Sequence, residues 1–310
     1  MILARQIQSF AFATGLSTWI ARRRHAFRVI MFHGVGDAHM PVDAFETNLR
    51  WLAERFRIVP LSDVVDGIQQ GRTPDSRSEV ALTFDDGLAN HFELAYPVLK
   101  RLRLPAAFFV CADLIESRRW IWNQEARTRL QAMTAQARLE FAQASVGLTT
   151  DSVELLVQRM KNLPLADRQR AEIDLQRRTP GFAASAQEHE RYDPMTWEQV
   201  AQLDPSLITI GSHSLSHPIL PSIGDAALER EVKESRRLLE ERLGRPVDLF
   251  CYPNGSQDDR VYACVSRCYR AALTTRYGFV RPSSDLHRMM RIPASANLPL
   301  MAWRMHWPNA

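Results

Sequence analysis

The chain has 310 residues, of which 45% are hydrophobic and 24% are charged, a composition typical of a globular protein with one large core. Its formal charge of +4 and isoelectric point near 9.0 are only mildly basic. The sequence contains no basic stripe interleaved with aromatic residues, so we exclude a nucleic-acid partner. The four cysteines lack zinc-finger spacing, and their contexts favour free thiols in a reduced, cytoplasmic setting over a disulfide framework.

Residues 1–27 predict an N-terminal helix that is separate from the rest of the chain. The apolar stretch from Phe10 to Ala21 is too short to cross a bilayer, which takes roughly 20 residues. It also lacks the flanking features of a secretion signal, so we expect a cytoplasmic protein, with the inner face of the membrane as a second location. Two interpretations stay open. The helix packs on the domain, or it lies on a membrane, with residues 1–24 and their Arg22-Arg23-Arg24 cluster against anionic lipid.

From residue 28 onwards, short apolar runs alternate with amphipathic segments. The predicted strands are 29–32, 57–61, 80–84, 106–110, 207–210, 247–252 and 271–275. The predicted helices are 45–56, 62–68, 92–102, 225–243 and 261–269, with capping boxes at Asp43 and Thr196. Repeated strand–helix units predict a parallel sheet with crossover helices, and polar residues at the ends of its strands predict an active site there.

Residues 116–190 interrupt this alternation. They are rich in Arg, Gln, Ala, Glu and Leu and contain no strand-like run, so we expect a helical insertion in residues 28–310, which otherwise form one domain. Its role stays open between a lid or partner surface and simple surface elaboration.

Two motifs follow predicted strands and carry the chemistry. Asp85 and Asp86 end the run 80–84, and His213 and His217 follow the run 207–210. Two carboxylates and two imidazoles suit a divalent metal site in which one carboxylate is a ligand and the other a base. The alternatives are an ordinary Asp-Asp-Gly turn and a buried pair of structural histidines. Pro218 disfavours a helical conformation at His217, so we expect a tight loop there.

These motifs resemble those of the polysaccharide deacetylases, the NodB homology domain of carbohydrate esterase family four. Thr83–Gly87 and His213–His217 are similar to the first two motifs, and Phe250–Gly255 stands where the third is expected. The resemblance covers residues 28–115 and 193–293. It implies an α/β fold, a distorted (β/α) barrel with a helical insertion, and metal-dependent hydrolysis of an N-acetyl group on a sugar.

The resemblance also implies roles for individual residues. Asp86, His213 and His217 would hold one divalent ion, with zinc expected first and cobalt, nickel or iron(II) as alternatives. Asp85 would be the general base. Asn254 and Tyr252 in the third motif would serve the substrate and the oxyanion, with the backbone N–H of Asn254 as a donor.

Two departures from the family pattern affect the site. The C-terminal histidine that serves as the acid in many members has no counterpart at His306, and we expect His33, at the end of the first strand, to take that role. The arginine expected two residues before the third-motif proline is replaced by Cys251. We therefore assign Arg291 the task of keeping Asp85 ionised.

The sequence thus predicts a metal-dependent carbohydrate N-deacetylase whose substrate is an N-acetylated polysaccharide or a lipid-linked saccharide. Two alternatives within this fold are an inactive glycan- or metal-binding protein and a deformylase or amidase acting on a lipid-linked sugar. A third, of a different class, is a membrane-associated partner protein that acts through residues 116–190.

Overall fold

The computed structural model describes residues 2–23, 26–74 and 78–306, and its centre is a sheet of parallel strands. The strands are β1 (Arg28–Phe32), β2 (Arg57–Ile58), β3 (Glu79–Phe84), β4 (Ala106–Val110), β5 (Ile208–Ser212), β6 (Leu249–Cys251), β7 (Ala271–Tyr277) and β8 (Met289–Pro293). Their order is β1-β8-β7-β6-β5-β4-β3-β2, and a further pairing of β1 with β3 closes a barrel of seven strands. The two-residue β2 pairs with the start of β3 and is shorter than the predicted strand 57–61.

Alternate residues along the strands face the inside of the barrel, as the two-residue period of a strand requires. The interior cluster is apolar and includes Val29, Ala81, Ala107, Phe109, Leu249, Leu273 and Met289. Their neighbours along the strands pack outwards against the helices, among them Ile30, Leu82, Phe108, Phe250, Ala272 and Ile292. Towards the carboxyl ends of the strands the buried residues become polar, so the candidate functional site lies at this end of the barrel.

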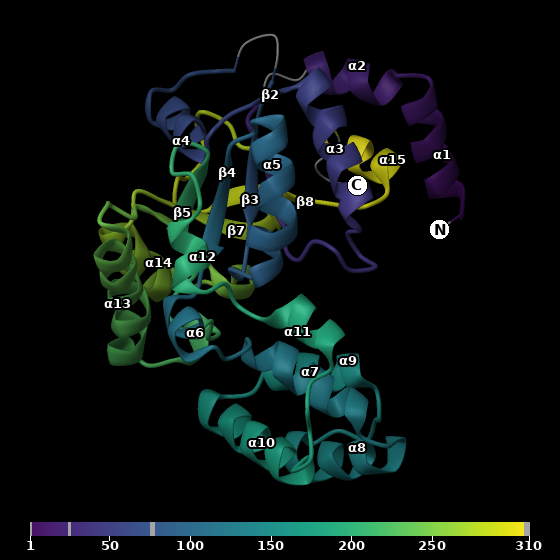
Figure 1. Ribbon diagram of the computed structural model, residues 1–310, viewed down its shortest axis with the longest axis vertical. Coiled ribbons are helices and arrows are strands. Elements are labelled where there is room, and N and C mark those ends of the chain that lie inside the picture. Colours follow the sequence, from purple (N-terminus) through teal and green to yellow (C-terminus); the bar gives the residue numbers. More distant parts are fainter. Residues whose placement is uncertain (1, 24–25, 75–77, 307–310) are drawn as a thin grey trace.

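Helices cover the outside of the barrel. They are α3 (Val42–Arg55), α4 (Leu61–Gln69), the π-helical turn η1 (His91–Ala95), α5 (Tyr96–Leu102), α13 (Asp225–Leu243) and α14 (Asp259–Cys268), with short 3₁₀ turns η3 (Leu220–Ser222) and η4 (Pro253–Gly255). The apolar face of α4 joins the interior cluster, at the end of the barrel away from the insertion (Figure 1). The predicted capping box at Asp43 is wrong, because α3 begins at Val42 after Pro41, whereas Thr196 and Gln199 do form one.

Apart from an isolated β-bridge between Pro194 and Leu88, the secondary structure between β4 and β5 is helical. It consists of α6 (Ala112–Ser117), α7 (Trp122–Ala132), α8 (Ala135–Phe141), the π-helical turn η2 (Ala142–Val146), α9 (Val153–Lys161), α10 (Leu165–Arg178), α11 (Ala186–Tyr192) and α12 (Trp197–Ala201). Helices α7 to α10 share a hydrophobic core of their own. Figure 1 shows them as a lobe below one end of the barrel.

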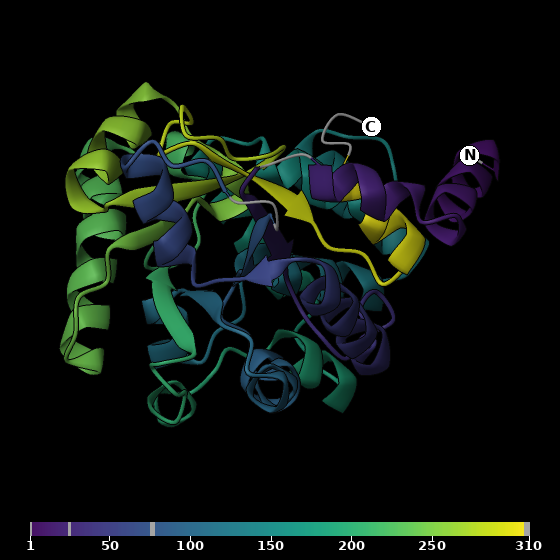
Figure 2. The ribbon, with the colours of Figure 1, turned by 90° about the horizontal axis from the view of Figure 1, so that it is seen from above.

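The N-terminal segment forms two helices rather than one, because Gly15 adopts a positive φ of 72° and interrupts the helical backbone. These are α1 (Ile2–Ala13) and α2 (Leu16–Arg23), and they pack against the C-terminal helix α15 (Leu298–Arg304), as Figure 2 shows from above. Ala11 is buried, while Ile7, Phe10, Leu16 and Trp19 are exposed on the same helix pair. Within the described residues, no helix is long and apolar enough to cross a membrane.

Candidate active site

The carboxyl ends of β3 and β5 bring the two predicted motifs together. The Asp85 N–H donates to the Phe32 carbonyl at 3.0 Å, which ties the end of β3 to the end of β1. The His213 N–H donates to the Val110 carbonyl at 2.9 Å, which ties the end of β5 to that of β4. Asp85, Asp86, His213 and His217 therefore lie at one end of the barrel, and all four are buried.

Asp86, His213 and His217 form a group with the composition of a metal site. Their ligand atoms lie within 4.8 Å of one another. One Asp86 carboxylate oxygen is 3.4 Å from Nε2 of His213 and 3.5 Å from Nε2 of His217. Nδ1 of His213 donates to the Cys251 carbonyl at 2.7 Å, which fixes the ring and directs Nε2 towards Asp86.

The loop that carries the histidines adopts a strained backbone. Ser214 and His217 have positive φ values of 66° and 60°, a region that side chains other than glycine rarely adopt. The carboxylate of Glu231 on α13 holds this loop, because it accepts the N–H groups of Leu215 and Ser216, each at 2.9 Å. The tight loop predicted before Pro218 is therefore present, and an acidic side chain from a neighbouring helix stabilises it.

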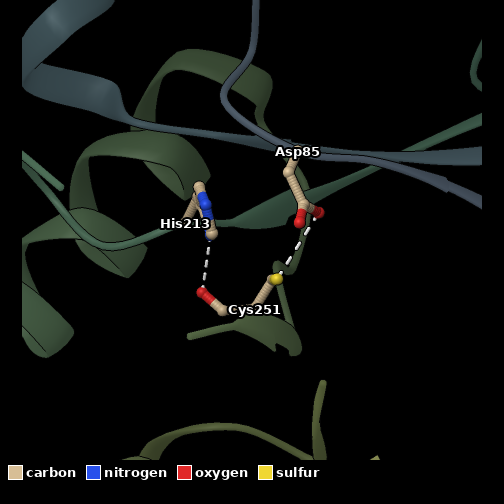
Figure 3. A group of neighbouring side chains, drawn as sticks. All are labelled: Asp85, His213 and Cys251. Carbon is tan, nitrogen blue, oxygen red and sulfur yellow. Dashed lines mark hydrogen bonds between the residues drawn. The ribbon is translucent and has the colours of Figure 1, made fainter. Parts of the chain in front are cut away.

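Asp85 points into the barrel, where it meets Arg291 on β8. Nη1 and Nη2 of Arg291 each donate to one Asp85 oxygen at 2.7 Å, a bidentate pair that is almost wholly buried. Nη2 also lies 3.2 Å from Sγ of Cys251, and that thiol lies 3.5 Å from Asp85 (Figure 3). Cys251, on β6, thus leaves room for a guanidinium that comes from β8.

Asp85, His213 and Cys251 form a second group with metal-ligand chemistry, but this group is a poorer cation site. Both Asp85 oxygens already accept hydrogen bonds from a positive guanidinium, which would repel a metal ion. Burial also raises the pKa of the Cys251 thiol, so the thiolate that a metal needs is disfavoured. The group around Asp86 is the better candidate.

The charges of the site keep Asp85 ionised and act in opposite directions on the two histidines. For His213, burial acts to lower the pKa, but the neighbouring Cys251 and the hydrogen bond to Asp86 outweigh it and raise the pKa well above its ordinary value. Burial alone would raise the pKa of Asp85, but the charge and hydrogen bonds of Arg291 outweigh it and lower the pKa to about 2. Burial alone would also raise the pKa of Asp86. The hydrogen bond from His213 and the charge of His217 outweigh burial and bring this pKa below its ordinary value. Burial and the nearby charge of His213 lower the pKa of His217 to about 3, so its ring is neutral at pH 7.

The two candidates for the acid differ in position. His33 follows β1, is exposed and lines the same cavity as Asp85 and His213. His306 is buried, packs against the ring of Trp303 and does not line that cavity. A buried residue that the sequence analysis missed, His91, donates from Nε2 to the His33 carbonyl at 2.9 Å.

The two third-motif residues lie on opposite sides of the strand end. Asn254 lines the cavity in a left-handed conformation with φ of 55°, and no acceptor for its backbone N–H is present among the described residues. Tyr252 does not reach the cavity, which corrects its prediction as a substrate residue. Because Cys251 faces inwards, the next residue faces outwards, and the Tyr252 hydroxyl donates to the His287 carbonyl at 3.0 Å.

The insertion supplies one wall of the cavity, which has a volume of about 760 Å³. Nε2 of Gln124 on α7 lies 3.4 Å from Oδ2 of Asp86, so the lobe reaches the candidate metal group. The other residues between β4 and β5 that line the cavity are Ile121, Asn123, Arg127, Gln131, Glu154, Lys161, Arg191 and Tyr192. Sequence reasoning did not identify these residues, since no short-range pattern shows which side of a helical lobe faces a barrel.

Three comparisons relate this chain to known proteins. A family model described as "Polysaccharide deacetylase" matches residues 72–270. The chain is 24% identical over 120 residues to YxkH of Bacillus subtilis, a protein assigned to the polysaccharide deacetylases, and this alignment covers 37% of the chain and only 43% of YxkH.

Two solved structures share the fold along almost their full length. The deacetylase PplD of Streptococcus pyogenes, solved with acetate, superposes with a TM-score of 0.62 at 17% identity, over 91% of this chain and 99% of PplD. IcaB of Ammonifex degensii superposes with a TM-score of 0.63 at 18% identity, over 91% of this chain and 98% of IcaB. The barrel with crossover helices predicted from the sequence is confirmed.

Proposed function

Because the chain belongs to the polysaccharide deacetylase family, we propose that it removes an N-acetyl group from an amino-sugar glycan by metal-dependent hydrolysis. Family membership supports hydrolysis of a carbohydrate amide bond, and the metal dependence and the substrate are the finer parts of this proposal. The observation that carries them is the group of Asp86, His213 and His217 beside the Asp85–Arg291 pair, at one end of the cavity.

The residues around Asp86 fit a divalent ion. One carboxylate and two imidazoles form a donor set that suits zinc, and cobalt, nickel or iron(II) can use the same ligands. Nδ1 of His217 is buried and has no hydrogen-bond partner among the described residues, while Nε2 of the same ring faces Asp86. When bound, such an ion polarises the acetyl carbonyl and makes a water molecule more acidic.

The chain's own residues supply the remaining chemistry. Asp85 accepts a proton from the attacking water, and Arg291 keeps this carboxylate ionised and fixed in orientation. The backbone N–H of Asn254 donates to the oxygen on which negative charge develops. His33, exposed to the cavity, gives a proton to the leaving amine.

The cavity favours a polar substrate such as a glycan. Buried polar side-chain atoms without a protein partner occur on Asn123, Gln124 and Asn254, which all line it. Such atoms are costly unless a ligand or water satisfies them, and sugar hydroxyl and acetamide groups have the matching chemistry. A polysaccharide and a lipid-linked saccharide both present such an acetamide. An inactive binding protein or a lipid-linked sugar deformylase stays the alternative.

We further propose peripheral membrane contact through residues 1–24, at the cytoplasmic face. Phe10 and Trp19 on α1 and α2 are 68% and 52% exposed, and Arg22-Arg23-Arg24 follow Trp19 closely in the sequence. Binding to vesicles that contain anionic lipid should fall in a Phe10→Ser/Trp19→Ser variant. Leu155→Ser, which changes a residue that is 57% exposed on the insertion, is the matched control. Equal vesicle binding by both variants would contradict this contact.

Acetate release tests the proposed activity most simply. The protein, dialysed against chelator and then supplied with one metal at a time, is assayed on N-acetylglucosamine oligomers, peptidoglycan fragments and a lipid-linked acetamido sugar. We expect acetate from at least one substrate, only with metal added. Retained metal with neither acetate nor formate released from any acylated glycan would favour the inactive binding protein.

A further inference from the structure

Three basic side chains between β4 and β5 line the cavity, and they differ in their partners. Arg127 donates two hydrogen bonds to Glu154, at 2.9 and 3.0 Å. Arg191 pairs with Asp37 at 3.1 Å. Lys161, the last residue of α9, forms no ion pair with any residue that the structure describes. One cation of the cavity wall therefore has no acidic partner.

The surroundings of Lys161 make this lack of a partner costly. The side chain is half-buried, and burial together with the charge of Arg127 lowers its pKa, against the opposing influence of Asp86 and Glu154. A partly desolvated ammonium beside another cation is unfavourable until an anion reaches it. Glu154 already binds Arg127, and Asp86 faces the two histidines, so the protein offers no carboxylate for this purpose.

We propose that Lys161 forms a subsite for an anionic group of the glycan, a carboxylate or a phosphate, next to the sugar that bears the reacting acetamide. The subsite deepens the proposed function and rests on it for the placement of that sugar. Gln124 on α7 lines the same cavity as Lys161, its side-chain amide touches Asp86, and its carbonyl oxygen is buried without a partner among the described residues. The insertion thus contributes substrate selection, while the barrel supplies the chemistry.

The substrate preference of the metal-loaded enzyme tests this subsite. The probes are a neutral N-acetylglucosamine oligomer, an oligomer that alternates N-acetylglucosamine with glucuronate, and N-acetylglucosamine oligomers joined through a phosphodiester. We expect a higher kcat/KM for at least one anionic probe than for the neutral one. In Lys161→Gln the ratio of anionic to neutral kcat/KM should fall about tenfold, in line with the loss of one charged hydrogen bond.

Two variants control for effects on folding. Lys161→Arg keeps the charge and should keep most of the preference. Lys100→Gln removes a lysine from α5, which does not line the cavity, and should leave the preference at the wild-type value. The carboxylate and phosphate probes separate the two sources of the anion, and preference for one alone identifies it. An equal ratio in wild type and Lys161→Gln would overturn the proposal.

Binding measurements keep the subsite testable if the enzyme releases no acetate. The chain contains three lysines, Lys100, Lys161 and Lys233, so reductive ¹³C-methylation gives few ε-amine signals, and Lys161→Arg identifies one of them. We expect that signal to shift with an anionic probe and not with the neutral one. Such a shift without hydrolysis would defeat the proposed function and keep the subsite. Hydrolysis with no shift from either anionic probe would defeat the subsite and keep the function.

Discussion

Arg291 binds both oxygens of Asp85 inside the barrel, through two hydrogen bonds of 2.7 Å between residues 206 positions apart in sequence. The pair is buried, so neither charge is screened by solvent, and the remaining guanidinium hydrogen bonds go to Thr274, Thr83 and Cys251. The carboxylate that we propose as the base is therefore ionised and fixed in orientation.

The first prediction concerns this pair. Arg291→Lys keeps the charge but loses the two parallel hydrogen bonds, and Arg291→Ala removes both. We expect turnover to fall at least tenfold in the first and further in the second, with a much smaller loss of bound metal. The control is Arg288→Lys, which changes an exposed pair with Asp259 that contributes little. Wild-type turnover in Arg291→Ala would contradict the role.

A rescue variant makes the same test more specific. Because Sγ of Cys251 lies 3.2 Å from Nη2 of Arg291, an arginine at position 251 can reach Asp85 once the residue at position 291 is small. Cys251→Arg combined with Arg291→Ala should recover part of the lost turnover. Failure of rescue in a variant that folds and binds metal would show that Arg291 is needed for more than its charge.

Glu231 should control metal affinity from outside the metal group. Its carboxylate accepts two N–H groups and the Ser216 hydroxyl of the histidine loop. Glu231→Gln weakens these bonds, so we expect metal affinity to fall tenfold or more, as with other supporting residues of metal sites. Competition with a chromophoric chelator measures this. Glu229→Gln on the same helix changes an exposed pair with Lys233 and should have no effect.

Gly255 and Gly244 offer a matched pair of alanine substitutions. Both adopt left-handed backbone, with φ of 67° and 64°, so each alanine should cost about 1 kcal/mol of the free energy of unfolding. At Gly255 a Cβ would also lie 2.1 Å from the Thr275 hydroxyl and 2.6 Å from its nitrogen, whereas at Gly244 it meets nothing within 4 Å. Gly255→Ala should displace Asn254 and lower turnover, and Gly244→Ala should not. Equal turnover in the two would contradict a role for that turn.

His91 should make the stability of the fold depend on pH. Burial lowers its pKa from 6.5 to about 4, while the unfolded chain protonates near 6.5. Between these values the unfolded state binds the extra proton, so the free energy of unfolding falls as pH drops, by about 3 kcal/mol in total. Urea unfolding with chelator present, at pH 7.5 and 4.5, measures this. His91→Phe, which packs among Phe84 and Phe108, should lose less stability over this interval than wild type. An identical loss would contradict the assignment.

The sequence could predict the barrel because its strands are short apolar runs with helical segments between them. The run 106–110 coincides with β4, and the predicted helix 225–243 coincides with α13. The break at Gly15 was missed, although a glycine in a helical pattern is a recognised signal. Strand β2 is short because it pairs only with the start of β3, while β1 pairs with β3 from Val80 to Phe84. This closure of the barrel is a long-range contact that no local pattern shows.

The site was predictable only in part. Asp85, Asp86 and the two histidines stand at strand ends, where a parallel barrel brings polar groups together. The same alternation rule would have turned Tyr252 away from the cavity, had it been applied to the residue after Cys251. Gln124 and Lys161 could not be found, because their position depends on how the insertion packs against the barrel and no local pattern encodes that.

The central claim is that Asp86 holds the metal and Asp85 does the proton transfer. The most direct test measures bound metal and acetate release together for wild type, Asp85→Asn and Asp86→Ala, on the best substrate of the wild type. We predict metal without acetate release in Asp85→Asn, and neither in Asp86→Ala. Equal loss of metal in both variants, or wild-type acetate release by Asp85→Asn, would contradict the account.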